Sequence, residues 1–267
     1  MLLSKSKLAI FSSLGTAKMR RKHSLFAVEG EKSVVDTLPV FDPVAIIHLE
    51  DYDPSRLSFS SGDTPSPVSA AGFSSGDTLP TALYSVDQAT MRRLSSLSTP
   101  PSVMAIYRLP VDDFSFADLP RRLYVVLDAI QDPGNLGTII RTCHWFGIKH
   151  IFASRDTVDI FNPKTVISTM GSIAHVGVHY CDLQELFAAN PDMPVCGMML
   201  DGENIYKATL PDHGFIVMGN EGNGISPAIR ARISHPLLIP PADADHSESL
   251  NVAIATAITL SHFQAHR

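Results

Sequence analysis

Three short polar loops contain the residue types that could do chemistry. One of them, MGNEGNGIS (218–226), places Gly219, Gly222 and Gly224 around Glu221. Its G-x-x-G-x-G spacing is neither the dinucleotide fingerprint nor the phosphate loop that ends in Lys-Ser/Thr. Glycines between a strand and a helix let backbone N–H groups face a ligand. This loop therefore predicts a ligand site without naming the ligand.

A second loop, QDPGNLGTIIR (131–141), leads into a helix. Pro133 and Gly134 indicate a turn, and Asn135 stands where an N-cap is expected. Arg141 lies off the apolar stripe of the helix and near enough to its start to project toward the loop. From this loop alone, a capped helix with a surface arginine is the simpler explanation.

The third loop, IPPADADHSESLNVAIA (239–255), precedes the last helix. Ser247 is the expected N-cap, with Ser249, Leu250 and Asn251 on the first turn. Simple capping and a ligand site explain these residues equally well.

The elements around these loops alternate strictly after residue 122. Apolar strands that alternate with helices predict a parallel sheet covered on both faces, and ligands bind at the carboxyl ends of such strands. The three loops follow strands that end at LDAI, FIVM and LLIP. The predicted strands are LYVVLDAI, HIFAS, VGVHYC, VCGMMLDG, FIVMGN and PLLIP, and the helices are LGTIIRTCHWFG, NPKTVIST, LQELFAA, SPAIRARI and SESLNVAIATAITLSHFQAH.

The first hundred or so residues have a different pattern. Strands are expected at 24–30, 44–50 and 103–109, and helices at EKSVVDTL and DQATMRRLSSL. The hexapeptide FSSGDT occurs at 59–64 and again at 73–78, within a Ser/Gly/Pro-rich stretch that we interpret as a loop insertion near 59–80. Residues 111–121 are expected to form a linker.

The segment GFSSG (72–76) formally matches the nucleophile elbow of serine hydrolases, with Ser74 as the nucleophile. No buried strand leads into it and no helical pattern follows it. We interpret the match as chance.

The charge and the cysteine content of the chain indicate its cellular compartment and the kind of molecule that it binds. The 267-residue chain has a net charge of −6, yet residues 1–28 contain no Asp or Glu and carry six cations. This basic arm fits phosphate contact, although a solvated charged turn explains it equally well. Three cysteines without a C-x-x-C pair predict neither disulfides nor a metal site, and they indicate a cytoplasmic protein. No apolar stretch is long enough to cross a membrane.

Together the three loops closely resemble the motifs of the SpoU (TrmH-type) RNA ribose methyltransferases in the knotted SPOUT superfamily. DPGNLGTIIR, MGNEGNGIS and ESLNVAIA occur in the order and at the spacings of that family. The opening KMRRKHSLFAVEGEKSV is similar to the start of the family's small α/β substrate-binding domain. The resemblance implies an RNA substrate-binding domain over 1–110 and an α/β methyltransferase domain with a parallel sheet over 122–267. In that domain, the ends of the last strands and the loops after them are expected to form a trefoil knot.

The resemblance also implies the chemistry: S-adenosylmethionine methylates a ribose 2′-hydroxyl of structured RNA, with ribosomal RNA favoured over transfer RNA. Base methylation and a non-catalytic RNA-binding protein that keeps the fold are the alternatives. The implied catalytic residues are Asn135, Arg141, Glu221, Ser249 and Asn251. The implied cofactor contacts are Leu200, Gly219, Asn220, Gly224, Ile239 and Leu250. RNA contacts are expected from Arg20, Arg21, Lys22 and Arg141.

Two departures from the family pattern stand out. The usual alanine two residues after the motif arginine is Cys143, a small-for-small change. The third loop is longer than usual and contains Pro241, Asp243 and Asp245, which affects the expected contacts around Ile239.

The last helix is apolar on more than one face, and with the resemblance this predicts a homodimer joined through the methyltransferase domain.

Overall fold

The computed structural model describes residues 2–57, 82–243, 245 and 247–266. The predicted insertion near 59–80 and the GFSSG segment lie outside these residues. The chain divides into two compact units, of which the first comprises Met1–Asp113 with Asp159–His175 and the second comprises Phe114–Val158 with Val176–Arg267. The segment Asp159–His175 therefore differs from the prediction, which placed it in the methyltransferase domain.

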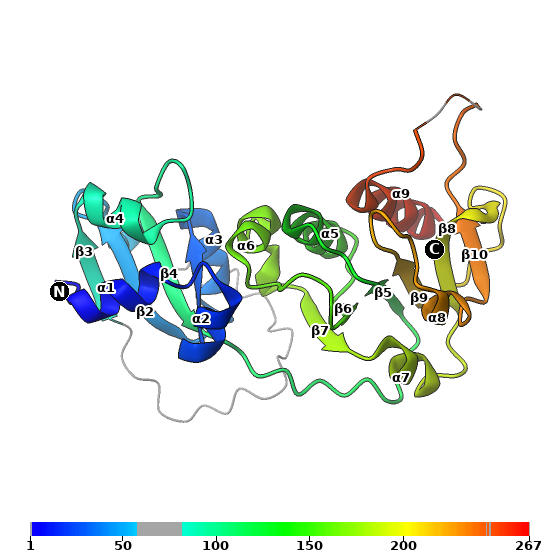
Figure 1. Ribbon diagram of the computed structural model, residues 1–267, viewed down its shortest axis with the longest axis horizontal. Coiled ribbons are helices and arrows are strands. Elements are labelled where there is room, and N and C mark those ends of the chain that lie inside the picture. The colour runs from blue at the N-terminus through cyan, green and yellow to red at the C-terminus, as the bar shows by residue number, and fades with distance from the viewer. Residues whose placement is uncertain (1, 58–81, 244, 246, 267) are drawn as a thin grey trace. The chain divides into compact units, whose positions relative to one another are not determined.

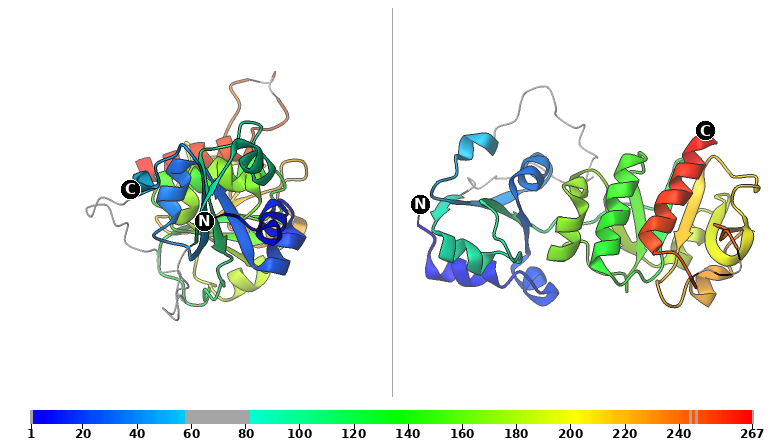
Figure 2. Two further views of the ribbon diagram at one scale, coloured as in Figure 1. Left: turned by 90° about the vertical axis from the view of Figure 1, so that its left-hand side faces the viewer. Right: turned by 90° about the horizontal axis from the view of Figure 1, so that it is seen from above.

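The first unit is built on a four-stranded sheet with the order β1-β4-β2-β3. Strand β4 is antiparallel to β1 and β2, whereas β2 and β3 are parallel. Helices α1, α2 and α4 lie on one side of this sheet and α3 lies on the other (Figures 1 and 2). The strands are β1 (Leu25–Glu29), β2 (Pro43–Leu49), β3 (Ala82–Val86) and β4 (Val103–Arg108). The helices are α1 (Lys5–Ser12), α2 (Ala17–His23), α3 (Glu31–Thr37), η1 (Pro54–Leu57) and α4 (Gln88–Leu94).

The segment Asp159–His175 belongs to this first unit because its side chains complete the core there. It contains α6 (Pro163–Thr169) and the short 3-10 helix η2 (Ser172–Ala174). The ring of Phe161 lies 4.5 Å from that of Phe26, centroid to centroid, and Phe26 also packs on Phe41 and Tyr107. Alternation of strands and helices along the sequence cannot reveal that one helix of the series covers a different sheet.

The second unit contains the predicted parallel sheet, with six strands in the order β10-β8-β9-β5-β6-β7. All of its pairings between these strands are parallel. The strands are β5 (Leu123–Leu127), β6 (His150–Ser154), β7 (Gly177–Cys181), β8 (Val195–Asn204), β9 (Gly214–Met218) and β10 (His235–Leu238). The helices are α5 (Pro133–Trp145), α7 (Leu183–Ala188), α8 (Pro227–Arg230) and α9 (Val252–Ala265).

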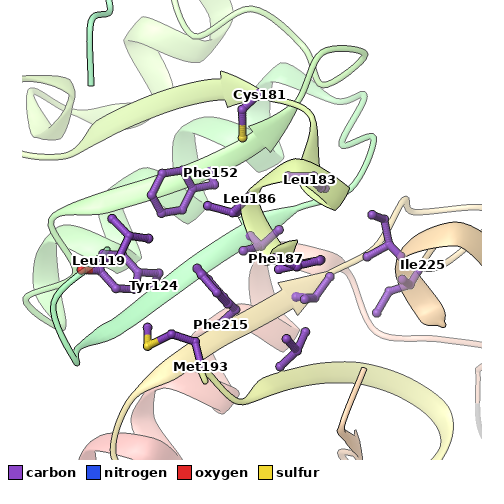
Figure 3. Packing of buried hydrophobic residues seen from close by; sticks show 14 residues of the cluster. Leu119, Tyr124, Phe152, Cys181, Leu183, Leu186, Phe187, Met193, Phe215 and Ile225 are labelled. Carbon is purple, nitrogen blue, oxygen red and sulfur yellow. The ribbon is translucent and has the colours of Figure 1, made fainter. Parts of the chain in front are cut away.

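Helices cover both faces of this sheet. Helices α5 and α9 pack against each other. On the other face, Leu186 and Phe187 of α7 point toward Phe152 and Phe215 of the sheet (Figure 3). Strands β5 and β9 are buried along their whole length, which explains their uninterrupted apolar sequences.

The chain before β5 is not a free linker over the whole predicted range 111–121. The Phe114 ring stacks on His179 with centroids 4.1 Å apart. Leu119 is buried, and its backbone N–H donates to Asn190 Oδ1 over 3.0 Å. The part of the predicted linker from Phe114 to residue 121 therefore belongs to the second unit.

In the described part of the chain, none of the helices has the length and apolar character that crossing a bilayer requires. Within the same residues, no group of His, Cys, Asp and Glu side chains is arranged to hold a metal ion.

Candidate active site

The glycine loop after β9 is held at both ends by the residues that follow β5. Asp128 is buried, and its Oδ2 accepts a hydrogen bond from the Ser226 backbone N–H over 2.7 Å. Near the start of the loop, Asn220 Nδ2 donates to the Ala129 carbonyl over 2.7 Å. Because β5 and β9 are paired neighbours, these two contacts fix the loop against the carboxyl edge of the sheet.

Two glycines of this loop are required by its own geometry. Asn220 and Gly224 exchange backbone hydrogen bonds of 2.9 Å in both directions. A Cβ at Gly219 would lie 2.4 Å from backbone atoms of Gly224 and Ile225, and Gly224 has a φ of +67°. The tight closure of the loop accounts for both glycines, whereas the sequence suggested only that a ligand approaches them.

The three predicted loops meet through a chain of side-chain hydrogen bonds. Asn135 Nδ2 donates to Glu221 Oε1 over 3.0 Å, and Asn251 Nδ2 donates to Asn135 Oδ1 over 2.9 Å. The Glu221 carboxylate also accepts from the backbone N–H groups of Gln131 and Asp132, at 3.3 and 3.4 Å. Glu221, Asn135 and Asn251 thus form a three-loop relay, with one residue from each loop.

The helix caps differ from the prediction in both helices that border the relay. Asp132, not Asn135, is the N-cap of α5, and its Oδ1 accepts from the Asn135 N–H over 2.9 Å. Asn251, not Ser247, is the N-cap of α9, and its Oδ1 accepts from the N–H groups of Ala253 and Ile254. Because Asp132 caps α5, the Asn135 side chain is available to the relay, whereas Asn251 caps α9 with its Oδ1 and donates to Asn135 with its Nδ2.

Arg141 and Ser249 are not joined to the relay by hydrogen bonds. Arg141 is exposed on α5, and within the described residues no ion pair or hydrogen bond engages its guanidinium. Ser249 is exposed just before α9, where its carbonyl accepts from Ser247 Oγ over 3.2 Å. The structure therefore brings together three of the five predicted catalytic residues and leaves these two side chains open to solvent.

The residues predicted to contact the cofactor lie in strand β8, which contains Leu200, and in two loops of the second unit, with Ile239 and Leu250 in the loop between β10 and α9. Gly219, Asn220 and Gly224 share the closed glycine loop described above. Leu200 is 70% exposed and Leu250 is 48% exposed. Leucine side chains this exposed beside polar loops are suited to cover an apolar part of a ligand, although single exposed leucines also occur without one.

Some supporting residues were missed by the sequence reasoning. Ala129 has a φ of +58°, and its N–H donates to Ser154 Oγ over 2.8 Å. The N–H of Ile130 donates to Thr157 Oγ1 over 3.3 Å. Asp128, the acid in the otherwise apolar predicted strand LYVVLDAI, was the one signal in the sequence that could have pointed to this support.

One predicted RNA contact is wrong. Arg20 is 2% exposed and forms an ion pair with Asp159, with Nη2 and Oδ2 2.6 Å apart. Its Nη1 also donates to the carbonyls of Leu14 and Gly15 over 3.0 Å. Arg20 is a structural residue, whereas its neighbours Arg21 and Lys22 are exposed.

Cys143 is fully buried, and burial raises the pKa of its thiol far above its usual range.

A parallel sheet with joined polar loops at its carboxyl edge is the arrangement by which α/β proteins bind ligands. Residues 122–261, more than half of the chain, match the SpoU rRNA methylase family. The chain therefore belongs to this family.

Relatives match over nearly the whole chain. The protein is 29% identical to the 23S rRNA (guanosine(2553)-2′-O)-methyltransferase RlmP of Bacillus subtilis, over 97% of this chain and 96% of that one. It is 32% identical to the structure of a TrmH-family putative RNA methyltransferase from Porphyromonas gingivalis, with a TM-score of 0.83 and full coverage of both chains. The fold is also that of the SpoU methyltransferase AviRb from Streptomyces viridochromogenes, solved with AdoMet (TM-score 0.80, 19% identity, 98% of both chains).

Proposed function

We propose that this protein transfers a methyl group from S-adenosylmethionine to a ribose 2′-hydroxyl of ribosomal RNA. The observation that carries the proposal is the three-loop relay of Glu221, Asn135 and Asn251. Family membership and the names of the relatives, several of which are 23S rRNA 2′-O-methyltransferases, support the substrate. We place the activity in the cytoplasm, in keeping with an RNA substrate and with the buried thiols of Cys143 and Cys196.

The residues of the second unit fit the cofactor. When bound, it supplies an electrophilic methyl group. In the closed loop from Gly219 to Gly224 the N–H groups of Asn220, Gly222, Asn223 and Gly224 bond within the loop, so its carbonyl groups are the ones offered to the cofactor. Leu200, Ile239 and Leu250 offer apolar surface. The protein's contribution is to hold the ribose oxygen in line with that methyl group and to keep both partners fixed.

Arg141 contacts the RNA. Its exposed guanidinium is free to bind a phosphate next to the target ribose. Because an arginine stays protonated at neutral pH, it positions the hydroxyl and does not act alone as the base. The relay residues and Ser249 then orient the ribose through their hydrogen-bonding groups. Arg21 and Lys22 of the first unit, both exposed, add phosphate contacts.

We further propose a homodimer formed through the second unit. Trp145 at the end of α5 is 85% exposed and Ile254 on α9 is 51% exposed, and these two helices pack against each other. Together they offer apolar surface to a second copy of the chain. In such a dimer Arg141 and Asn251 of one site come from different chains.

The deciding experiment combines binding and product mapping. Calorimetric titration with S-adenosylmethionine should show saturable binding, and incubation with unmodified ribosomal RNA and labelled cofactor should give a labelled 2′-O-methyl ribose. A protein that binds RNA but gives no heat with the cofactor would instead be a non-catalytic RNA-binding protein. Label on a base instead of a ribose would contradict the proposed reaction.

A further inference from the structure

Two groups of exposed cations in the first unit differ in their partners. Outside α1, α2 and α4, three of them are engaged in ion pairs. Lys32 Nζ lies 2.8 Å from Asp36 Oδ2, Arg56 Nη2 lies 2.9 Å from Glu31 Oε1, and Arg108 Nε lies 2.9 Å from Asp42 Oδ2. These cations are locally neutralised by the acids beside them.

The exposed cations on α1, α2 and α4 have no acidic partner of this kind, unlike the buried Arg20 of α2, which pairs with Asp159. None of these three helices contains an Asp or Glu. In the described part of the chain, no ion pair engages the exposed side chains of Lys5, Lys18, Arg21, Lys22, Arg92 and Arg93. The acid nearest to them in sequence, Asp87, is the N-cap of α4, where its Oδ1 accepts from the Thr90 N–H over 2.8 Å.

Packing gathers these helices on one side of the sheet. Phe11 and Leu14, in and just after α1, share one buried cluster with Met91 and Leu94 of α4. Helices α1, α2 and α4 accordingly lie on the same side of the four-stranded sheet (Figure 1 and the right-hand view of Figure 2). Because Met91 and Leu94 point into the core, Arg92 and Arg93 are left on the outer surface.

Basic residues at a helix end also have an ordinary structural use. Arg92 and Arg93 lie in the last turn of α4, and Arg21 and Lys22 lie in the last turn of α2. Cations there interact favourably with the helix dipole. That use does not require the surrounding surface to be free of acids on three separate helices, and it predicts an effect on stability but none on RNA binding.

We infer that the side of the first unit formed by α1, α2 and α4, here called the cationic face, is the surface that binds the phosphate backbone of the RNA substrate. The inference rests on the proposed function and adds Arg92 and Arg93 of α4 as contacts, together with Lys5 and Lys18. Unpaired cations spread over three helices suit a long polyanion. The chain as a whole is acidic, with a net charge of −6. The cationic face is therefore the part of the surface that attracts a polyanion electrostatically.

The test compares two double variants that remove the same charge. Arg92→Ala/Arg93→Ala takes two unpaired arginines from the cationic face, whereas Arg56→Ala/Arg108→Ala takes two ion-paired arginines from elsewhere in the unit. The probe is a 23S rRNA fragment that the wild-type protein methylates, and its Kd is measured over a series of salt concentrations. The first variant should bind the RNA about tenfold more weakly at low salt. The slope of the logarithm of its Kd against the logarithm of the salt concentration should be smaller than that of the wild type by about 2. The control should stay within about twofold of wild type.

Each remaining outcome has a defined meaning. Equal losses in the two variants, or an unchanged slope in Arg92→Ala/Arg93→Ala, would overturn the cationic face while leaving methyl transfer intact. A wild-type protein that binds the cofactor but no RNA would overturn the face and the proposed function together. Arg21→Ala/Lys22→Ala on α2 repeats the test independently, and thermal melting shows that each variant is folded.

Discussion

At the scale of single residues, the site depends on a few hydrogen bonds between loops that are far apart in sequence. Glu221 accepts from Asn135 and from two backbone N–H groups of the first loop, and Asn251 donates to Asn135. Each partner is held by another, so the loss of one side chain disturbs two loops at once. Arg141, which is outside this relay, is the residue whose removal best isolates catalysis from loop structure.

Arg141→Ala should reduce methyl transfer by at least about a hundredfold, because a positioned charge at the reacting group is lost. The melting temperature and the cofactor affinity should stay close to wild type, since no hydrogen bond or ion pair within the described residues engages its guanidinium. Single-turnover methylation and calorimetry measure the two effects. Near-normal turnover would remove Arg141 from the mechanism. Lys149→Ala, at an exposed position beyond α5, is a matched control.

Asp128→Asn tests the support of the glycine loop. The substitution keeps the shape of the side chain but removes the charge that accepts the Ser226 N–H at 2.7 Å. A hydrogen bond to a charged group contributes about 1.5–3 kcal/mol, so cofactor affinity should fall by roughly tenfold or more while kcat at saturating cofactor changes little. A drop in kcat with unchanged cofactor affinity would show that Asp128 does not act through the loop.

Arg20 and Arg21 are neighbours with opposite environments, which allows a direct comparison of stability. Arg20→Ala leaves Asp159 without its partner and opens a buried site, and it should cost about 3 kcal/mol of unfolding free energy. Arg21→Ala removes an exposed charge and should change stability by less than about 0.5 kcal/mol. Denaturant unfolding of both variants gives the values. Equal stabilities would contradict the structural role of Arg20.

The residue scale is also where sequence reasoning reached its limit. The three motifs contain the three residues that the structure joins by hydrogen bonds, and the catalytic role of these residues stays a prediction. The same reasoning treated Arg20 as one more cation of a basic arm, since nothing local shows that Asp159, far along the chain, neutralises it. It also misplaced both helix caps, because Asp132 and Asn135 are equally good capping residue types.

At the scale of elements, the parallel sheet of the second unit was predictable and its helices less so. Apolar strands such as β5 and β9 are buried on both faces and can be recognised by composition alone. Helices α1 and α2 and strand β3 were not predicted, because each is short and lacks a clear apolar period. Helix α9 was predicted, but its start was placed too early because Ser247 also resembles a cap.

Helix α9 carries the prediction of a shared site. Its buried side, which includes Val252, Thr256 and Phe263, faces its own unit, whereas Ile254 remains half exposed. Mixing an Arg141→Ala chain with an Asn251→Ala chain should restore up to about a quarter of wild-type activity, by random pairing, if each site uses both chains. Light scattering at micromolar concentration should report a dimer. A fully active monomer would contradict the proposal.

At the scale of the whole molecule, the division into units does not follow the order of the chain. The first unit needs Asp159 and Phe161, which come after the first two strands of the second unit's sheet. A fragment that ends at residue 113 should therefore melt well below the same unit in the full chain, because Arg20 loses Asp159 and Phe26 loses Phe161. Fragment melting followed by circular dichroism checks this, and an equally stable fragment would contradict it.

The position of Phe161 and Asp159 also affects how the protein is made. A domain normally folds as soon as its last residue leaves the ribosome, and synthesis proceeds at about 5–20 residues per second. The first unit cannot be completed until residue 175 has emerged, by which time β5 and β6 are already outside. The first unit of a nascent chain should therefore stay incompletely folded for several seconds. During that time its exposed apolar surface should be the first binding site for chaperones.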